Sequence, residues 1–248
     1  METRPDFVTA AKEILTTRYP NAAFAYVAGS IIRGEQTDYS DIDLVVVFEK
    51  LECATRESFV YRGWPVEAFV HDPETMNYFF QESDAKSGRP CLPQMVLEGL
   101  TLPCETPLSR ELKTLAGKVI NQGPPELGRA ELEDRIYFIS DLVDDLRAPR
   151  SQSEAIAVGA RLFELLGDFY LRGKGQWSGS GKGLARALAK YSPDLANSYS
   201  EAFQKLFNGD SISVINLAQE ILKPYGGCRF DGYVRPAAKD RRKKLDAR

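Results

Sequence analysis

Two aspartates at the start of an apolar run constrain this chain more than any other feature of its sequence. Asp41 and Asp43 open the run at residues 42–48, and an earlier apolar run ends at Gly29. Side chains at i and i+2 project from the same face of a strand, so a strand over residues 42–48 turns both carboxylates to one side. Mg2+ is typically held by one or two carboxylates and completed by water and phosphate oxygens. The pair therefore predicts a site for a hard divalent cation.

The Gly29–Ser30 pair between the two runs suits a phosphate group. Glycine permits close approach of the backbone, and the following amides and the Ser30 hydroxyl can donate hydrogen bonds to phosphate oxygens. A carboxylate pair opposite such a cradle is what a nucleotide-using site needs. Each motif alone has a simpler interpretation, because Gly-Ser pairs are common in loops and Asp-x-Asp is more often a turn. Their order between two apolar strands favours the nucleotide site.

A third acidic residue lies further along the chain. Glu67 alternates with apolar residues over 65–70, a pattern typical of a strand. Taken alone, Glu67 could be a carboxylate on an edge strand that faces solvent.

This combination resembles the signature of the DNA polymerase beta-like nucleotidyltransferase superfamily, a Gly-Ser pair followed by a loop and an Asp-hydrophobic-Asp triplet. Aminoglycoside adenylyltransferases are similar in more detail. They have a Val-Glu strand followed by a His-Asp pair, and antibiotic nucleotidyltransferases often carry an arginine three residues after the serine. The matching residues here are Gly29, Ser30, Arg33, Asp41, Ile42, Asp43, Val66, Glu67, His71 and Asp72.

The resemblance implies roles for these residues, and it implies that the strand of Glu67 neighbours the strand of the aspartate pair. Asp41 and Asp43 would be ligands of two Mg2+ ions, and Glu67 a further ligand, a general base toward the acceptor, or both. Ser30 and Arg33 would hold the triphosphate, although Arg33 could equally be a surface cation of the loop.

Lys182 is the second candidate phosphate contact. It follows Gly179, Ser180 and Gly181, but this is not a Walker A loop because Gly183 stands where Ser or Thr is required. Adenylyltransferases that modify antibiotics often carry a lysine near the start of a helix in their helical domain, and the resemblance assigns that role to Lys182. The alternative is a surface lysine in a first helical turn.

Periodicity divides the chain in two. The pattern of residues 1–123 predicts an α/β domain with a small mixed sheet, and that of residues 124–238 predicts an all-α helical bundle. The resemblance makes the first the catalytic domain and the second the acceptor-binding domain. A Gly-Pro-Pro linker at 123–125 separates them, and 239–248 is a charged tail. The expected strands are 23–27, 42–48, 58–61 and 66–70, with 49–57 as a polar connection. The expected helices are 6–18, one from 73, 92–100, 109–122, 131–146, 153–171, and others beginning near 182, 193 and 211.

Composition narrows the classes of partner. A net charge of −3 argues against nucleic acid, because phosphate neutralisation normally shows as a basic excess. One histidine and four dispersed cysteines provide no zinc-ligand set, and we expect buried or incidental thiols in a reducing compartment. No apolar run is long enough for a membrane span and no leader is evident, so we expect a cytoplasmic protein. The oligomeric state stays open.

The resemblance implies transfer of a nucleoside monophosphate, with ATP as the default donor, to a hydroxyl of a small molecule with release of pyrophosphate. Acidic residues of the helical half, between 133 and 168, would suit a polycationic aminoglycoside, but charged outer faces are normal for amphipathic helices. Two alternatives remain. One is AMPylation of a protein, as in antitoxins of this superfamily, and the other is a nucleotide-binding regulatory module without catalysis, against which the complete acidic set argues.

Overall fold

The computed structural model describes residues 4–238 and 240–242 and contains two compact units. The N-terminal unit consists of the chain up to Pro125 together with Gly175–Gly179, and the C-terminal unit of Glu126–Lys174 and the chain from Ser180 onward. The sequence predicted a boundary after residue 123, but it did not predict that residues 175–179 return to the first unit. The predicted tail, 239–248, lies outside the described residues except for 240–242.

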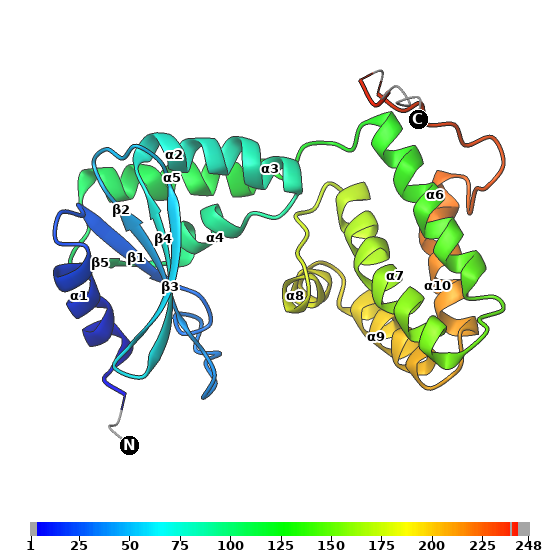
Figure 1. The fold of residues 1–248 in the computed structure, drawn as a ribbon, viewed down its shortest axis with the longest axis horizontal. Helices are drawn as coiled ribbons and strands as arrows, with labels where there is room; N and C mark the ends of the chain where they lie inside the picture. Colours follow the sequence, from blue (N-terminus) through cyan, green and yellow to red (C-terminus); the bar gives the residue numbers. More distant parts are fainter. Residues whose placement is uncertain (1–3, 239, 243–248) are drawn as a thin grey trace, which may run out of the picture. The chain divides into compact units, whose positions relative to one another are not determined.

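The N-terminal unit is built on a five-stranded mixed sheet (Figure 1). The strand order is β3-β4-β2-β1-β5, in which β2 and β4 are parallel and the other neighbours are antiparallel. The strands are β1 (Phe24–Ala28), β2 (Ile42–Val47), β3 (Thr55–Tyr61), β4 (Trp64–His71) and β5 (Leu100–Leu102). This sheet with its helices, followed by a helical C-terminal region, confirms the predicted fold class.

Alternate residues of the buried strands serve two separate cores, one on each face of the sheet. Ile42, Leu44 and Val46 pack with helix α1 (Phe7–Arg18) on one face. Val45 and Val47 pack on the other face with α2 (Pro73–Tyr78), α4 (Cys91–Glu98) and α5 (Pro107–Gln122), and Figure 1 shows these helices opposite α1. A π-helical turn (Phe79–Ser83) and α3 (Asp84–Ser87) continue from α2. The register places Asp43 on the second face, in line with Val45.

Two strands differ from the sequence prediction. Strand β3 begins at Thr55, inside the segment predicted as a polar connection, and the short strand β5 lies where irregular chain was predicted. β3 is an edge strand whose side chains are exposed or only half-buried, so it lacks the apolar alternation by which buried strands are recognised. Its polar residues made it resemble a loop.

The C-terminal unit is helical over its described residues and has one core. The α-helices are α6 (Arg129–Asp145), α7 (Gln152–Gly173), α8 (Lys182–Tyr191), α9 (Pro193–Phe207) and α10 (Ile212–Leu222), with a 3-10 turn at Lys223–Tyr225. Their buried faces repeat at helical spacing, as at Leu162, Leu166 and Phe169 of α7. The predicted all-α bundle is confirmed.

Trp177 belongs to the segment that returns to the N-terminal unit. Its indole Nε1 donates a hydrogen bond to the Ile120 carbonyl at 2.8 Å, and the Ser178 amide donates to the Gly88 carbonyl at 2.8 Å. The ring packs against the core that α2, α4 and α5 form with the sheet. Trp177 therefore anchors this segment, which explains the aromatic residue without a ligand.

The cysteines were predicted to be buried or incidental. The free thiols at Cys53, Cys91, Cys104 and Cys228 all belong to exposed residues, which favours the second alternative. Among the described residues, none of the helices combines the length and apolar character that crossing a membrane requires.

Candidate active site

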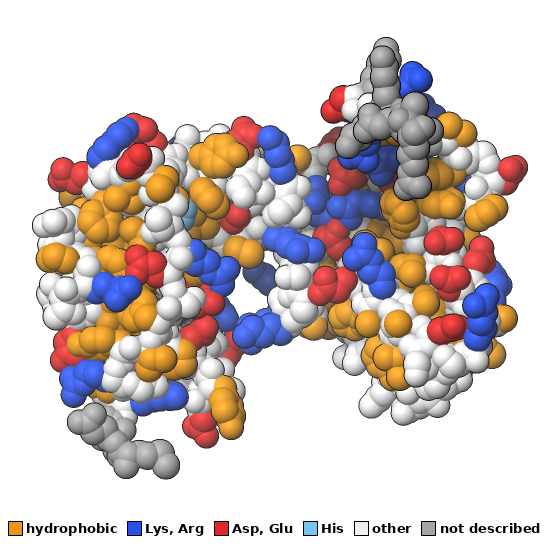
Figure 2. All heavy atoms as spheres, in the orientation of Figure 1, with side chains coloured by type: hydrophobic (Ala, Val, Ile, Leu, Met, Phe, Trp, Pro, Cys, Tyr) orange, Lys and Arg blue, Asp and Glu red, His pale blue; other side chains and the backbone are white. Residues whose placement is uncertain are grey.

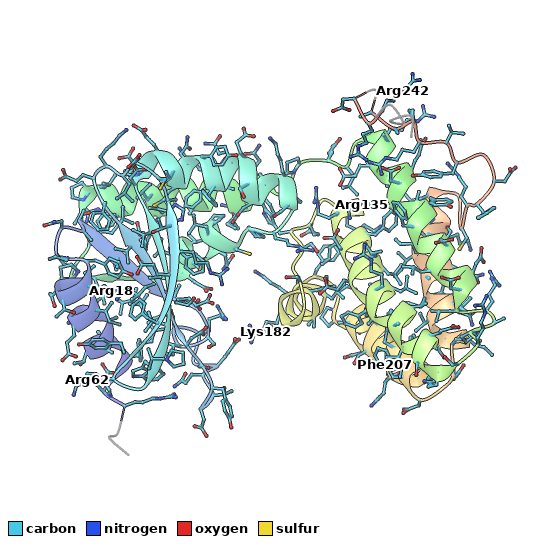
Figure 3. All side chains as sticks on the ribbon, viewed as in Figure 1. Arg18, Arg62, Arg135, Lys182, Phe207 and Arg242 are labelled. Carbon is cyan, nitrogen blue, oxygen red and sulfur yellow. The ribbon has the colours of Figure 1, made fainter. Side chains whose placement is uncertain are left out.

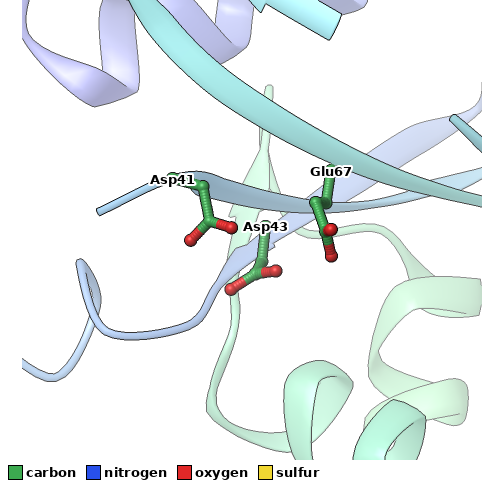
Figure 4. Close-up of side chains that lie close together, drawn as sticks. All are labelled: Asp41, Asp43 and Glu67. Carbon is green, nitrogen blue, oxygen red and sulfur yellow. The ribbon is translucent and has the colours of Figure 1, made fainter. Parts of the chain in front are cut away.

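Three carboxylates converge at one end of the sheet (Figure 4). Asp43 and Glu67 are directly paired in the parallel register of β2 and β4, and Asp41 precedes the first residue of β2 by one position. One oxygen from each of Asp41, Asp43 and Glu67 lies within 4.8 Å of the other two, and all three residues are half-buried. Strand pairing thus brings together the acidic residues that the sequence singled out.

The donor set suits a hard divalent cation. Like charges at this spacing repel one another, and a bound cation offsets that repulsion. Sites built only from carboxylate oxygens favour Mg2+, Mn2+ or Ca2+ over softer metals. The partial exposure of the cluster leaves access for the water and phosphate oxygens with which Mg2+ completes its coordination. The residues present therefore fit the predicted metal.

Gly29 has a reason to be glycine that the sequence did not reveal. It follows β1, whose last residue, Ala28, is paired with Asp43. A Cβ atom on Gly29 would overlap the Asp43 Oδ2 atom and would lie 3.0 Å from its Cγ atom. The φ angle of Gly29 is +82°, a conformation that L side chains rarely adopt. The Asp43 carboxylate thus rests where a side chain at position 29 would be.

Ser30 lies in the loop that joins β1 to β2. Its hydroxyl donates to Ser40 Oγ at 3.2 Å, and Ser40 Oγ also accepts a hydrogen bond from the Thr37 amide at 2.8 Å. These bonds close the loop on itself beside the carboxylates. The contact of Ser30 with a phosphate stays a prediction.

Arg33 is held by two carboxylates of its own unit. Its guanidinium pairs with Glu98 at 2.6 Å, at the end of α4, and with Glu35 at 3.1 Å. A role in holding the triphosphate requires exchange of at least one of these carboxylates for phosphate oxygens. That role stays a prediction.

Lys182 is the exposed first residue of helix α8 (Figure 3). It belongs to the C-terminal unit, whereas the three carboxylates belong to the N-terminal unit. The preceding Gly181 amide donates to Glu164 Oε1 at 2.7 Å, so a carboxylate of the same unit already occupies this helix start. A contact between Lys182 and nucleotide phosphates stays a prediction.

Arg56 joins the carboxylate cluster, although the sequence did not point to it. Its Nη2 atom lies 2.7 Å from Glu67 Oε2, and its guanidinium lies over the Phe69 ring at 5.0 Å from the centroid. The segment 49–57 was predicted to be a connection. The available signal was the charged pair Arg56–Glu57 directly before the predicted hairpin, because charged side chains are common on exposed edge strands.

The His71–Asp72 pair is structural. His71 is buried at the end of β4 with its Nδ1 atom 3.3 Å from Thr75 Oγ1, and burial lowers the histidine pKa to about 4. Its imidazole is therefore neutral at pH 7. Asp72 caps α2 by accepting from the Thr75 amide at 2.8 Å, and it also accepts from the Leu51 amide at 2.9 Å. The pair fastens the end of β4 to α2.

Acidic residues of the helical unit largely have internal partners. Figure 2 shows acidic and basic side chains interspersed on the visible face. Asp134 pairs with Arg235 at 2.6 Å and accepts a hydrogen bond from the Tyr233 hydroxyl. The Tyr233 ring stacks on the Tyr137 ring, with their centroids 3.9 Å apart. Other pairs join Glu133 to Arg129, Asp144 to Arg147 and Asp168 to Arg135. These contacts favour the structural interpretation of the acidic helices over a binding surface for a polycation.

Comparison with known proteins places the chemistry in the N-terminal unit. Residues 8–98 match a family model described as a nucleotidyltransferase domain. No curated protein matches the chain. The chain is also similar to the crystal structure of a nucleotidyltransferase-like protein from Exiguobacterium sibiricum 255-15, with 13% identity, coverage of 88% of this chain and 75% of that chain, and a TM-score of 0.44. We draw nothing from a structural likeness of this degree.

The matched residues include β1, β2, β4 and the whole carboxylate cluster. The chain therefore contains a nucleotidyltransferase domain, and the protein is a nucleotidyltransferase enzyme that uses a nucleoside triphosphate and transfers its nucleoside monophosphate.

Proposed function

We propose that the protein is a Mg2+-dependent adenylyltransferase that moves AMP from ATP to a hydroxyl of a small molecule and releases pyrophosphate. The observation that carries this proposal is the convergence of Asp41, Asp43 and Glu67 within 4.8 Å beside Gly29, inside the matched domain. Carboxylates in this number can hold divalent cations, and those cations in turn offset the negative charge of a triphosphate.

Each residue has a defined role in the proposal. Asp41 and Asp43 would hold two Mg2+ ions, and Glu67 would hold the ion nearest the acceptor, take the proton of the acceptor hydroxyl, or do both. When bound, Mg2+ supplies Lewis-acid stabilisation of the charge on the phosphoryl oxygens and the leaving pyrophosphate. Ser30 and the amides after Gly29 would donate to phosphate oxygens.

Two basic residues complete the proposed nucleotide site. Arg33 would exchange its contact with Glu98 for the triphosphate, where a guanidinium offsets leaving-group charge. Lys182 would contribute a second positive charge from the start of α8.

The C-terminal helical unit is proposed to select the acceptor, and an aminoglycoside is the first acceptor to test. Small polar acceptors of other kinds belong in the same test, because several acidic side chains of α6, among them Glu133 and Asp144, pair with arginines. A second candidate function is AMPylation of a protein. A module that binds nucleotide without transfer is the third, and the complete carboxylate set disfavours it.

Purified protein incubated with labelled ATP, Mg2+ and separate acceptor panels tests these functions. Release of pyrophosphate together with an AMP mass increment on a small molecule supports the proposal. Label on a protein instead supports AMPylation. ATP binding with no transfer to aminoglycosides, extract metabolites or proteins would favour the module.

Asp43→Asn is the matching variant. It keeps the size of the side chain but removes a negative charge from the proposed metal site, so we expect transfer to fall at least about 100-fold with little change in melting temperature. Circular dichroism verifies the fold, and pyrophosphate release measures the activity. Undiminished transfer in a folded variant contradicts the proposed mechanism.

A further inference from the structure

We propose that Arg56 is a positioning residue that holds Glu67 at the carboxylate cluster and competes with the metal for it. The inference rests on the proposed function, because it assumes that Asp41, Asp43 and Glu67 form a metal site. It adds a residue from the edge strand β3, which carries positive charge to the rim of an acidic site.

Strand register places Arg56 beside Glu67. In the antiparallel pairing of β3 and β4, Arg56 is opposite Phe69 and Ser58 is opposite Glu67. Residues 56 and 58 share one face, so the Arg56 side chain reaches diagonally to Glu67. The guanidinium is positioned by two contacts: its Nη2 atom forms the 2.7 Å ion pair with Glu67, and the group lies over the Phe69 ring.

Fold stability is a weak explanation for this pair. The Arg56 side chain is 61% exposed and that of Glu67 is 30% exposed, and ion pairs with such exposure add little to stability. Their location is more informative. Glu67 belongs to the carboxylate cluster and also pairs with Arg56 of the adjacent strand, so its carboxylate is shared between that arginine and the site.

Sharing of Glu67 has a definite electrostatic consequence. A positive charge close to a cation site repels the cation and so lowers its affinity. The same guanidinium restricts the carboxylate to one orientation, which favours catalysis by keeping the ligand in place. Neutralising Arg56 should therefore strengthen metal binding while weakening turnover, a combination that general loss of structure does not produce.

The same strand offers a matched control. Arg18 of α1 pairs with Glu57 of β3 at 2.7 Å and lies over the Phe59 ring at 4.3 Å from the centroid. The chemistry and exposure resemble those of the Arg56 pair, with 49% and 35% of the two side chains exposed. Residues 57 and 59 face the opposite side of β3 from residue 56. Removing Arg18 should leave the metal site unaltered.

The test is a titration of the full chain with Mn2+ in the absence of nucleotide. Binding is monitored by the electron paramagnetic resonance signal of free Mn2+ and by calorimetry. We expect Arg56→Gln to tighten Mn2+ binding by about threefold to tenfold, since one nearby positive charge is lost in a partly exposed site. Arg56→Lys keeps the charge and should bind Mn2+ within about twofold of the original protein. Arg18→Gln should match the original protein, and Arg56→Gln should also have a lower kcat with ATP and its acceptor.

Three results separate the possibilities. If the original protein binds Mn2+ and Asp43→Asn does not, but Arg56→Gln binds unchanged or more weakly, the inference fails and the proposed function stands. An equal tightening in Arg18→Gln also overturns it, because the effect would then be a general one of net charge. If neither the original protein nor Asp43→Asn binds Mn2+ at millimolar concentration, the metal site and the inference both fail.

Discussion

Two glycine-serine loops of this molecule look alike in sequence and differ in structure. Gly29–Ser30 follows strand β1, and the second loop, Gly179–Gly183, runs into helix α8, of which Gly183 is the second residue. At Gly29 the place of the missing side chain is filled by the Asp43 carboxylate, whereas no atom lies within 4 Å of that place at Gly181 or Gly183. The comparison shows that the requirement for glycine at position 29 comes from a carboxylate on the neighbouring strand, not from the Gly-Ser sequence itself.

The two loops also differ in the acidic groups they meet. Carboxylates from two strands converge beside the Gly29 loop, where a cation can offset their repulsion. At the second loop a single carboxylate, Glu164, accepts from the Gly181 amide at 2.7 Å and satisfies a helix start. The first arrangement gathers like charges that a cation would offset, whereas the second is a single hydrogen bond at the start of a helix.

The largest expected effect comes from Gly29→Ala, which attacks the distinctive contact of the first loop. The new Cβ atom would displace the Asp43 carboxylate and strain a backbone at φ +82°. We expect transfer activity to fall on the order of 100-fold, as for displacement of a catalytic group by an ångström. The strain should lower the free energy of unfolding by about 1–3 kcal/mol. Pyrophosphate release and chemical denaturation measure the two effects.

Gly34→Ala is the control for that variant. Gly34 has a φ angle of +70° in the same loop, but no atom lies within 4 Å of its missing Cβ. Its substitution should reproduce the loss of stability and leave most of the activity. Equal activity losses in the two variants would show that loop strain, rather than the Asp43 carboxylate, explains the glycine at position 29.

An intermediate effect is expected at the second loop from Lys182→Ala. If Lys182 contacts nucleotide phosphates, the KM for ATP should rise about tenfold with a small change in kcat, since a charge-assisted hydrogen bond is lost. Lys190→Ala, an exposed lysine in the last turn of the same helix, is the control. Identical ATP kinetics in both variants would make Lys182 a surface residue and leave the second loop without a nucleotide role.

The smallest effect is expected from Gly183→Ala in the first turn of α8. The residue is helical, and open space surrounds the position of an added Cβ. Alanine should raise the free energy of unfolding by up to about 1 kcal/mol, because it loses less conformational freedom in a helix than glycine does. Thermal or urea unfolding measures this change, and ATP kinetics should be unaltered. A loss of stability would contradict this prediction, because it would mean that the added methyl group meets an obstacle where the structure has open space.

Only part of the carboxylate cluster follows from local rules. Asp41 and Asp43 are two residues apart at the start of a buried strand, and Glu67 alternates with apolar residues in another, so periodicity predicts the face of each side chain. That the two strands are neighbours was expected from the family resemblance. The contact between Gly29 and Asp43 was not predictable, since it depends on the register of β1 against β2. Register is set by pairing across the sheet rather than by either strand alone.

Arginine partners were hidden for a different reason. Arg33 meets Glu98, which is 65 positions away, and Arg56 meets Glu67 from a strand that periodicity could not detect. In the helical unit, the spacing of apolar residues predicted the bundle, but it could not show which acidic residues had arginine partners. Glu133 with Arg129 and Asp144 with Arg147 are pairs at helical spacing, but Asp134 with Arg235 joins segments whose proximity follows only from the complete fold.

The return of Gly175–Gly179 to the N-terminal unit has a consequence for how this protein can be divided. The polypeptide passes from one unit to the other after Pro125, after Lys174 and again after Gly179. A gene fragment that stops at the double proline would lack the indole that caps the Ile120 carbonyl. A chimera that joins a different helical domain to this N-terminal unit would therefore need an equivalent of the segment Gly175–Gly179. Without it, the surface that Trp177 covers would be exposed to solvent.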